Sequence, residues 1–306
     1  MAGNIVVPLD GSALAEKALP LAAALATRSG EKLVLLRLVA ETAEIEAELK
    51  SARAYVEEVH REITHPDLDN RLEPNRVEVQ VVPGNPEDLG PIISKLDATL
   101  VVMTTHGRTG LSRLIMGSVA KQTLAHLNVP VILIRPADIV DSQLPMELMY
   151  RSSELPGPEH SYAAQMVVTL DGTPEAETVL QPAAALARAL RFTLCLVRVV
   201  TPHHPITEGV NFASVPDLEQ RHYEAAQYLK GLQHSLTEQD VNCTSQVLTG
   251  EPDREIVDYA GQRGVVMLAM ASHTRGKLGR LVLGSVAEKV MSATHLPVMM
   301  VHPAAS

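Results

Sequence analysis

Two acidic turns in the sequence contain residues that could bind a ligand. Asp10-Gly11-Ser12 follows the apolar run at residues 5–9, and Asp171-Gly172-Thr173 follows a similar run at residues 166–170. In one interpretation each is a strand-to-helix turn, in which glycine supplies backbone freedom and Ser or Thr caps the helix. In the other, the aspartate is a carboxylate at the end of a strand that accepts a hydrogen bond from a ribose hydroxyl or a base amine. The residues alone leave both interpretations open.

A third segment, residues 103–120, turns on Gly107 and ends in Gly117-Ser118 where a helix is expected to begin. A helix N-terminus presents free N–H groups and about half a positive charge, which favours a phosphate. Gly117 removes the Cβ that would block a close approach, and Ser118 offers a hydroxyl. Arg108 and Arg113 would add positive charge. The segment therefore favours a phosphate site, although capping by itself also explains Gly-Ser before a helix.

The sequence repeats the elements that must position these turns. Residues 5–26 resemble residues 166–187 at an offset of 161, and residues 117–137 resemble residues 284–304 at an offset of 167. A nearly constant offset indicates that one domain is present twice, with a small insertion. The stretch between the copies is rich in proline and has no sustained periodicity. We therefore predict a first domain at residues 1–137, a linker at 138–162 and a second domain at 163–306.

Each copy alternates short apolar runs with amphipathic stretches, in the order βαβαβαβαβ. Crossover helices require parallel strands, and apolar runs without polar alternation indicate strands covered on both faces. The predicted fold class is α/β, with two tandem, doubly wound, five-stranded parallel sheets that are Rossmann-like. Ligands in such sheets bind at the carboxyl ends of the strands, where the winding direction reverses. In the first copy strands are expected at residues 5–9, 33–39, 77–82, 99–103 and 131–134, and helices at about 13–28 and 43–60, after Pro86 and from Gly117.

Composition excludes several classes of function. The formal net charge is −10, with 36 acidic and 26 basic residues, so a broad basic footprint for nucleic acid is not expected. Aromatic residues make up 3% of the chain, too few to build stacking platforms for single strands. No apolar run approaches the roughly 18 residues that span a bilayer, and the first residues do not have the pattern of a signal peptide. We expect a cytoplasmic protein with no nucleic-acid or membrane partner.

Both copies resemble the universal stress protein family over nearly their whole length. The family has a loop of the form GxxG, nine residues, then Gly followed by Ser or Thr. The first copy has residues 104–107 (TTHG), nine residues and Gly117-Ser118; the second has residues 271–274 (ASHT), nine residues and Gly284-Ser285. The GxP turns at residues 84–86 and 250–252 and the final VPV or LPV strand extend the resemblance. It implies a fold like that of the adenine nucleotide alpha hydrolases.

The resemblance also implies that ATP binds to this loop, as it does in the nucleotide-binding branch of the family. The turn after the first strand and the backbone at the end of the second strand would then hold adenine and ribose, and the glycine loop would hold ribose and phosphates. In the first copy the implied residues are Asp10, Gly11, Ser12, Val39, Thr104, His106, Gly107, Arg108, Gly117, Ser118 and Val119. In the second copy they are Asp171, Val199, Gly284 and Ser285.

Departures from the family loop distinguish the two copies. Thr104 places a β-branched side chain where the family has glycine, which narrows the ribose pocket but leaves the phosphate site at Gly117. Thr274 stands where the loop calls for a positive φ, which costs a β-branched residue on the order of 1 kcal/mol. We therefore expect ATP mainly in the first domain, and poor binding or a different ligand in the second. The alternative is a scaffold of the same fold that binds no nucleotide and acts through protein partners.

Catalytic chemistry is not expected from these residues. His106 and His273 occupy equal positions, but no Cys or carboxylate stands near either in the sequence to form a relay. The chain has no GxxxxGK[ST] motif, and it has neither the HxGH-like nor the SGGxxS-like loop of adenylating enzymes. We predict no catalytic residue, no metal ligands from the protein and at most slow ATP hydrolysis. A Mg²⁺ ion would be held mainly by the phosphates of ATP and a few hydroxyls.

Further segments predict packing and association. The Glu-rich residues 41–58 indicate a surface helix, Cys195 and Cys243 indicate small apolar residues in strands, and the Met-rich strands near 265–270 and 298–301 indicate core. The final strands, 131–134 and 298–301, lie at sheet edges in the family's topology. An unpaired apolar edge favours pairing, so we expect the two halves to pair with each other. A homodimer through another face, and protein partners that respond to nucleotide occupancy, are further expectations.

Overall fold

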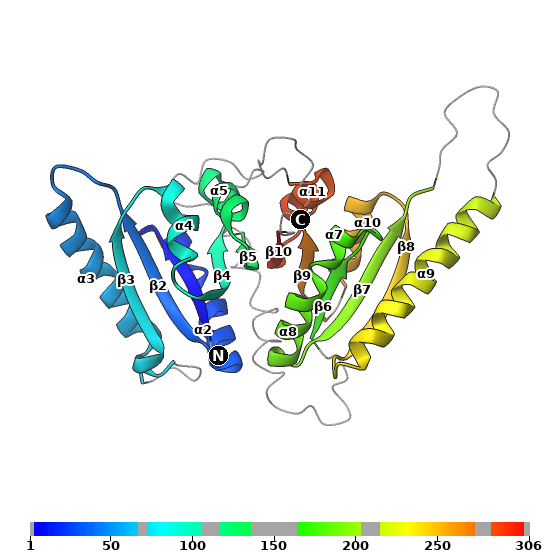
Figure 1. Cartoon of the computed structure of the whole chain (residues 1–306), viewed down its shortest axis with the longest axis horizontal. Helices are drawn as coiled ribbons and strands as arrows, with labels where there is room; N and C mark the ends of the chain where they lie inside the picture. Colours follow the sequence, from blue (N-terminus) through cyan, green and yellow to red (C-terminus); the bar gives the residue numbers. More distant parts are fainter. Residues whose placement is uncertain are drawn as a thin grey trace, which may run out of the picture.

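The computed structural model describes residues 3–66, 72–105, 117–135, 164–202, 215–262, 264–272 and 283–302. Its two repeats are α/β units that lie side by side (Figure 1). The first contains β1 (Asn4–Leu9), α1 (Ala13–Glu16), α2 (Leu19–Ser29), β2 (Lys32–Val39), α3 (Ile45–Ile63), β3 (Val77–Pro83), α4 (Leu89–Ile93), β4 (Ala98–Thr104), α5 (Ser118–His126) and β5 (Val131–Ile134). The second contains β6 (Gln165–Thr169), α7 (Pro174–Glu177), α8 (Leu180–Leu190), β7 (Thr193–Val200), α9 (Val215–Thr237), β8 (Cys243–Thr249), α10 (Pro252–Ala260), β9 (Val265–Ala271), α11 (Ser285–Ala293) and β10 (Val298–Val301).

The strands form one continuous sheet in the order β3-β2-β1-β4-β5-β10-β9-β6-β7-β8. Within each half all neighbouring strands are parallel, so the predicted doubly wound topology is confirmed. The expected pairing of the two edges is also confirmed: β5 and β10 are antiparallel, and Ile132 lies opposite Met299. Through this pairing the two predicted five-stranded sheets join into one ten-stranded sheet, because each half ends in an apolar edge strand that covers the other.

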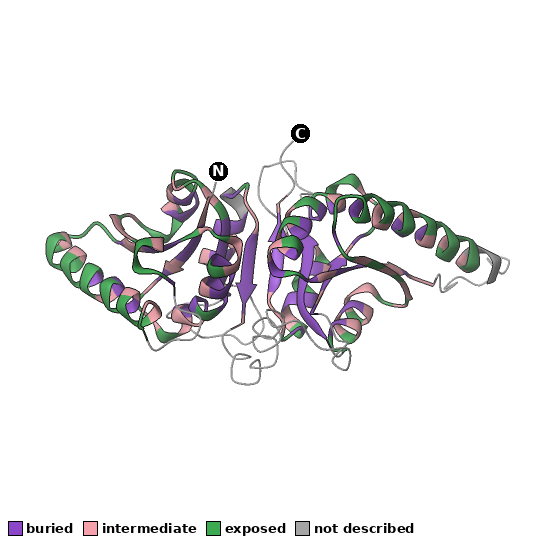
Figure 2. Ribbon diagram, turned by 90° about the horizontal axis from the view of Figure 1, so that it is seen from below, coloured by how far each residue is buried: buried purple, intermediate pink, exposed green. Residues whose placement is uncertain are grey.

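Burial follows the apolar runs of the sequence. All seven residues of β9 are buried, and the Met-rich strands are core, as predicted. Helices α2, α3, α8 and α9 contribute to the cluster on one face of the sheet, and α4, α5, α10 and α11 to the cluster on the other. Figure 2 shows the buried residues concentrated in the strands and the exposed ones on the outer sides of the helices. This two-sided cover is why the strands lack polar alternation.

The predicted helix at residues 13–28 is wrong in one respect, because it is two helices. α1 ends at Glu16 and α2 begins at Leu19. Pro20 has no N–H to donate to the carbonyl of Glu16, so the α-helical ladder is interrupted at that turn. The second repeat has the same break between α7 and α8, where Pro182 is the third residue of α8. Both repeats therefore have a break in this helix, although the hydrophobic periodicity of the sequence continues across it.

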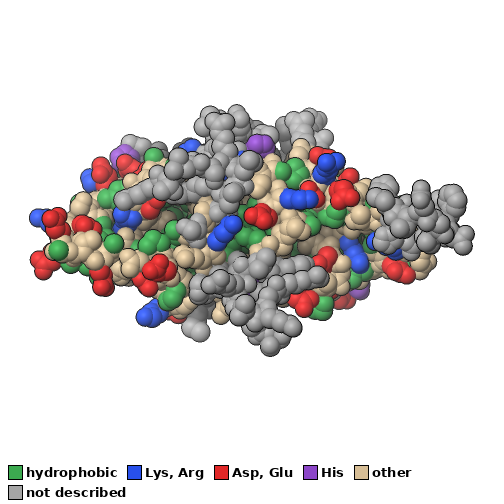
Figure 3. Space-filling model, turned by 90° about the horizontal axis from the view of Figure 1, so that it is seen from above, with side chains coloured by type: hydrophobic (Ala, Val, Ile, Leu, Met, Phe, Trp, Pro, Cys, Tyr) green, Lys and Arg blue, Asp and Glu red, His purple; other side chains and the backbone are tan. Residues whose placement is uncertain are grey.

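The remaining packing predictions are confirmed where the structure describes them. Only Ala52, Val56 and Val59 of α3 are buried, so the Glu-rich helix is a surface helix. Cys195 is buried in β7 and Cys243 is half-buried in β8, and both are free. On the face of the molecule in Figure 3, the Lys and Arg side chains of the described residues lie among Asp and Glu side chains. None of the described helices is long and apolar enough to cross a membrane.

Contacts across the junction between the repeats reach beyond the strand pair. The half-buried Arg135, directly after β5, donates hydrogen bonds to the carbonyl oxygens of Ser292 and Thr294 at 2.6 and 3.2 Å. These carbonyls belong to the C-terminal end of α11, where a positive charge is favourable. On the same side of the sheet, Lys121 of α5 lies 3.8 Å from Glu288 of α11. The first repeat therefore contacts both ends of α11.

Candidate functional site

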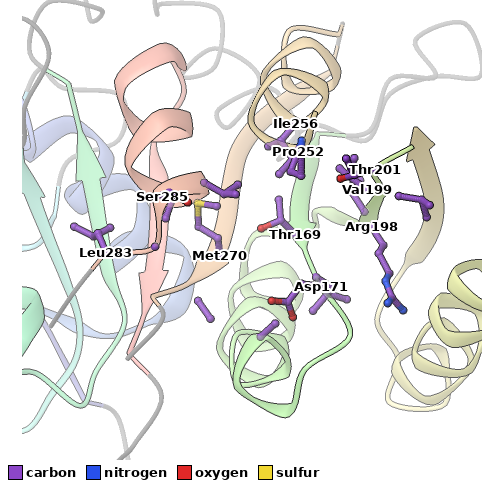
Figure 4. Close-up of a pocket in the computed structure, with 18 of the residues that line it drawn as sticks. Thr169, Asp171, Arg198, Val199, Thr201, Pro252, Ile256, Met270, Leu283 and Ser285 are labelled. Carbon is purple, nitrogen blue, oxygen red and sulfur yellow. The ribbon is translucent and has the colours of Figure 1, made fainter. Parts of the chain in front are cut away.

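A cavity of about 690 Å³ lies at the carboxyl ends of β6, β7 and β9 (Figure 4). β6 pairs with β7 on one side and with β9 on the other, so the winding direction of the second repeat reverses here. The cavity is also lined by the first turns of α10 and α11 and by two residues of α9. Its volume falls in the range of small-molecule sites, and its position is the one where doubly wound sheets bind ligands.

The aspartate turn lines this cavity, and its geometry repeats in both halves. Asp171 accepts hydrogen bonds at Oδ1 from the N–H of Thr173 at 2.9 Å and from its hydroxyl at 2.6 Å. Thr173 in turn caps α7, and Gly172 has a φ of 90°. Asp10 and Ser12 make the same contacts at 2.9 and 2.5 Å before α1. The turn interpretation is therefore confirmed in both repeats, and Asp171 also lies in the cavity wall.

The backbone at the end of the second strand of each repeat is fixed by the GxP turn. The N–H of Gly84 donates to the carbonyl of Val39 at 2.9 Å, and the N–H of Gly250 donates to that of Val200 at 3.1 Å. The structural counterpart of Val39 is therefore Val200 rather than its neighbour Val199. Both Val199 and Val200 line the cavity.

The helix that begins after the fourth strand forms the opposite side of the site. Gly284 and Ser285 line the cavity together with Leu283 and the two residues that follow in α11. In the first repeat, Gly117 precedes α5, and its N–H donates to the carbonyl of Thr105 at 2.9 Å. Val119 lies in the first turn of α5, and Thr104 is buried at the end of β4. The start of each helix is thus placed at the carboxyl edge of the sheet.

Two cavity residues from α9 and one from β7 are absent from the sequence prediction. Arg198 lies with its guanidinium carbon 5.1 Å from the centre of the Tyr228 ring. Arg221 donates to the carbonyl of Thr201 at 3.0 Å, and Glu224 lies one turn further along α9. One sequence signal could have identified the first of them, because Arg37 and Arg198 interrupt otherwise apolar strands at the same position of the repeat.

Each repeat also contains a half-buried tyrosine beside its aspartate turn. Tyr55 donates to Glu16 at 2.7 Å, and Tyr228 donates to Glu177 at 2.9 Å. Burial first, and then the hydrogen bond to Glu16, raise the pKa of Tyr55 above its usual range. The same two causes raise the pKa of Tyr228. Both phenols are therefore neutral donors at physiological pH, and they fix the helix after the second strand against the turn.

Comparison with known proteins assigns the chain to a family. The model of the universal stress protein family matches residues 1–135 and 164–302. The chain belongs to the universal stress protein family. Because the two matched segments cover both repeats, it is a tandem universal stress protein, as the sequence resemblance implies.

Individual relatives of this universal stress protein are distant. A universal stress protein of Mycobacterium tuberculosis is 29% identical over 206 residues, which cover 66% of this chain and 61% of the relative. The match thus spans less than two thirds of the length of that relative. Stress response protein NhaX of Bacillus subtilis is 24% identical over 163 residues, covering 46% of this chain and 98% of the relative. A universal stress protein structure from Archaeoglobus fulgidus has a TM-score of 0.65 at 16% identity and covers 98% of each chain, which shows a shared fold.

Part of the predicted loop of this universal stress protein lies outside the described residues. His106, Gly107 and Arg108 of the first repeat and His273 and Thr274 of the second belong to that part. For Ser118 the structure gives the helical backbone alone. Among the described residues, no group of three or more His, Cys, Asp or Glu side chains is arranged to hold a metal ion.

Proposed function

We propose that this tandem universal stress protein is a stress-response regulator that binds ATP, mainly in its first domain, and hydrolyses it slowly at most. The proposal includes the domain boundaries given by the sequence, with domain 1 at residues 1–137, a linker at 138–162 and domain 2 at 163–306. One observation carries it: the elements that enclose the cavity of domain 2 recur in domain 1 with the same hydrogen bonds.

Three described features of domain 1 support an ATP site. The carboxylate of Asp10 lies at the end of β1, where it would accept a hydrogen bond from ribose or the adenine amine. The end of β2 at Val39 is held by Gly84. Gly117 precedes the nine-residue helix α5, whose first N–H groups would face the phosphates without an intervening Cβ. Thr104, the residue that departs from the family loop, is 6% exposed, so its side chain is packed within the strand end.

Slow hydrolysis follows from the groups that the site offers. Among the described residues that line the cavity of domain 2, the acids are Asp171 and Glu224, and Asp171 is held by the turn. A strong ATPase needs a positioned base and a well-held metal ion. A Mg²⁺ ion bound with ATP would be held mainly by the phosphates and by a few hydroxyls. The nucleotide would then act as a signal rather than as a substrate.

Titration calorimetry of the nucleotide-stripped full chain with ATP and Mg²⁺ tests the proposal. We expect about one ATP per chain in the wild type. Gly117→Glu, which places a carboxylate at the start of α5, should abolish this binding. Gly231→Glu is the matched control, because Gly231 lies on the exposed side of α9 with no atom within 4 Å of a Cβ at that position.

Two results would overturn it. Absence of ATP binding in the wild type would favour the non-nucleotide scaffold, which acts through protein partners. Binding that survives Gly117→Glu but is lost in Gly284→Glu would move the ATP site to domain 2.

We also propose that the chain forms a homodimer through a face other than the β5–β10 junction, which is occupied within the chain. Sedimentation equilibrium with and without ATP measures that association.

A further inference from the structure

We propose that domain 2 binds a 6-oxopurine nucleotide, one with a guanine-type base, in place of an adenine nucleotide. The inference rests on the proposed function, because it assumes that the repeats bind nucleotides. It concerns the wall of the cavity formed by the end of β7 and by α9, which we call the arginine wall. This wall consists of Arg198, Arg221 and Glu224.

The cavity is long enough to place the two ends of a nucleotide on different walls. In Figure 4, Ser285 at the start of α11 lies on one side of the cavity, and Arg198 and Thr201 lie on the other. β9 and β6 lie between these sides, next to β7 in the sheet. Neighbouring strands are about 4.8 Å apart, so the cavity is on the order of 10 Å across. A phosphate at the start of α11 therefore leaves the base at the arginine wall.

The arginine wall is rich in hydrogen-bond donors. Within the described residues, the guanidinium of Arg198 makes a cation–π contact with Tyr228 and no hydrogen bond or salt bridge. It lies over the aspartate turn, since a Cβ on Gly172 would come within 2.8 Å of its Cζ atom. Arg221 uses one nitrogen on the carbonyl of Thr201. A guanidinium has five N–H donors, so both arginines retain donors for a ligand.

The charges around the wall favour a neutral acceptor over a second phosphate. Asp171 and Glu224 line the same cavity as the two arginines. Glu177 lies next to them, because it accepts from Tyr228, the ring on which Arg198 rests. The three acids therefore outnumber the two guanidinium groups. The wall has no net positive charge, so it would attract a second anionic group of the ligand only weakly. A neutral carbonyl oxygen can still accept hydrogen bonds from the arginines.

Base chemistry then selects the ligand. Guanine presents two acceptors, O6 and N7, on one edge, and a guanidinium fork donates to both. Adenine presents the N7 acceptor beside the N6 amine, which is a donor. One N–H group of the guanidinium would then face an N–H group of adenine and could not form a hydrogen bond with it. A donor that is buried by a ligand and left without a partner costs about 1–3 kcal/mol. The carboxylate of Glu224, which already accepts from Gln220 at 2.7 Å, adds acceptor capacity for the amino group of guanine.

Domain 1 keeps an arginine, Arg37, at the position of Arg198 but has the opposite charge at the position of Arg221. Tyr55 and Tyr228 are equivalent, because each donates to the same glutamate of its repeat. Seven residues before each tyrosine stand Glu48 in domain 1 and Arg221 in domain 2. Glu48 accepts from Thr42 in the loop after β2 at 3.0 Å, just as Arg221 contacts the loop after β7. Arg37 donates to the carbonyl of Leu9 at 3.3 Å. An acceptor thus replaces a donor where an adenine amine would lie.

Calorimetric titration of the nucleotide-stripped full chain with GTP and Mg²⁺ tests the inference. We expect one GTP site that is retained in Gly117→Glu. Arg221→Glu, which copies the residue of domain 1, should weaken GTP binding about 10- to 100-fold. Arg254→Glu is the control. It makes the same charge change as Arg221→Glu, but at an exposed position of α10 that does not line the cavity. Arg221→Gln, which keeps a neutral donor, should lose less affinity than Arg221→Glu.

Each alternative outcome has a separate meaning. ATP binding without detectable GTP binding overturns this inference and leaves the proposed function in place. Loss of GTP binding in Gly117→Glu, or an equal effect of Arg221→Glu and Arg254→Glu, also overturns it. Absence of both nucleotides refutes the proposed function itself. Circular dichroism melting identifies a variant that fails to fold, and Arg221→Gln then supplies the decisive comparison.

Discussion

The hydrogen bonds that Arg135 donates across the junction predict a measurable loss of stability when they are removed. Arg135→Met keeps most of the aliphatic stem but removes the bonds to Ser292 and Thr294 at the end of α11. A hydrogen bond from a charged group contributes about 1.5–3 kcal/mol, and a cation at a helix C-terminus contributes about 0.3–1 kcal/mol. The site is half-buried and the second bond is long. We therefore expect a loss of about 2 kcal/mol in the free energy of unfolding.

Thermal unfolding followed by far-ultraviolet circular dichroism measures this effect, because the chain has no Trp for fluorescence. A loss of about 2 kcal/mol corresponds to a decrease of about 4–8 °C in Tm for a cooperative unit of this size. Arg188→Met is the control, since Arg188 makes one exposed hydrogen bond of 3.3 Å to Gln239. It should change stability by less than about 0.5 kcal/mol. Equal Tm values for the two variants would refute the argument that Arg135 secures α11 across the junction.

Three further predictions concern single side chains. Burial, and then the hydrogen bond to a carboxylate, raise the pKa of Tyr55 above the ordinary value of 10.0. As the pH rises, the unfolded chain therefore releases the phenolic proton before the folded chain does, which lowers the stability of the fold. Urea unfolding should show a steeper loss of stability above pH 10 in the wild type than in Tyr55→Phe. Burial raises the pKa of the Cys243 thiol to about 12, so its reaction with iodoacetamide at pH 8 should be much slower than in urea, and equal rates would refute this. Gly172→Ala and Gly30→Ala should each lose about 1–2 kcal/mol in chemical denaturation, because both glycines have positive φ; unchanged stability in both variants would contradict this.

Because the two repeats differ in sequence, the junction between them can carry different side chains on its two sides, which a junction between two identical repeats could not. Lys121 and Glu288 occupy the same position of their repeats and face each other at 3.8 Å. Two copies of either repeat related by the same pseudo-twofold axis would place like charges there. Because the pair is exposed, it contributes about 0–1 kcal/mol. The pair therefore affects which repeats associate. A junction between two copies of the same repeat would bring two lysines or two glutamates together and would be disfavoured by a comparable free energy.

Much of the architecture is determined by the sequence alone, because its causes are local. Apolar runs without alternation define strands that are buried on both faces, and their recurrence defines two repeats. Asp-Gly-Ser and Asp-Gly-Thr encode their own turn, since the aspartate, the positive φ and the helix cap lie within three residues. The pairing of β5 with β10 was also predictable, because both are short apolar strands that the family resemblance places at sheet edges, but their antiparallel direction comes from the structure. The proline break between α1 and α2 was present in the sequence but hidden by continuous periodicity.

Only the tertiary structure decides which side chains meet at the cavity and at the junction. Arg221 reaches the carbonyl of Thr201, 20 residues away, because α9 packs across the ends of β7 and β8. Arg135 reaches Ser292 over 157 residues because the two sheets join. A sequence specifies a polar residue and its charge, but packing decides the direction and partner of a long side chain. For this reason the sequence reveals two universal stress protein repeats, whereas the difference between the walls of the repeats appears only when helices and strands are placed together.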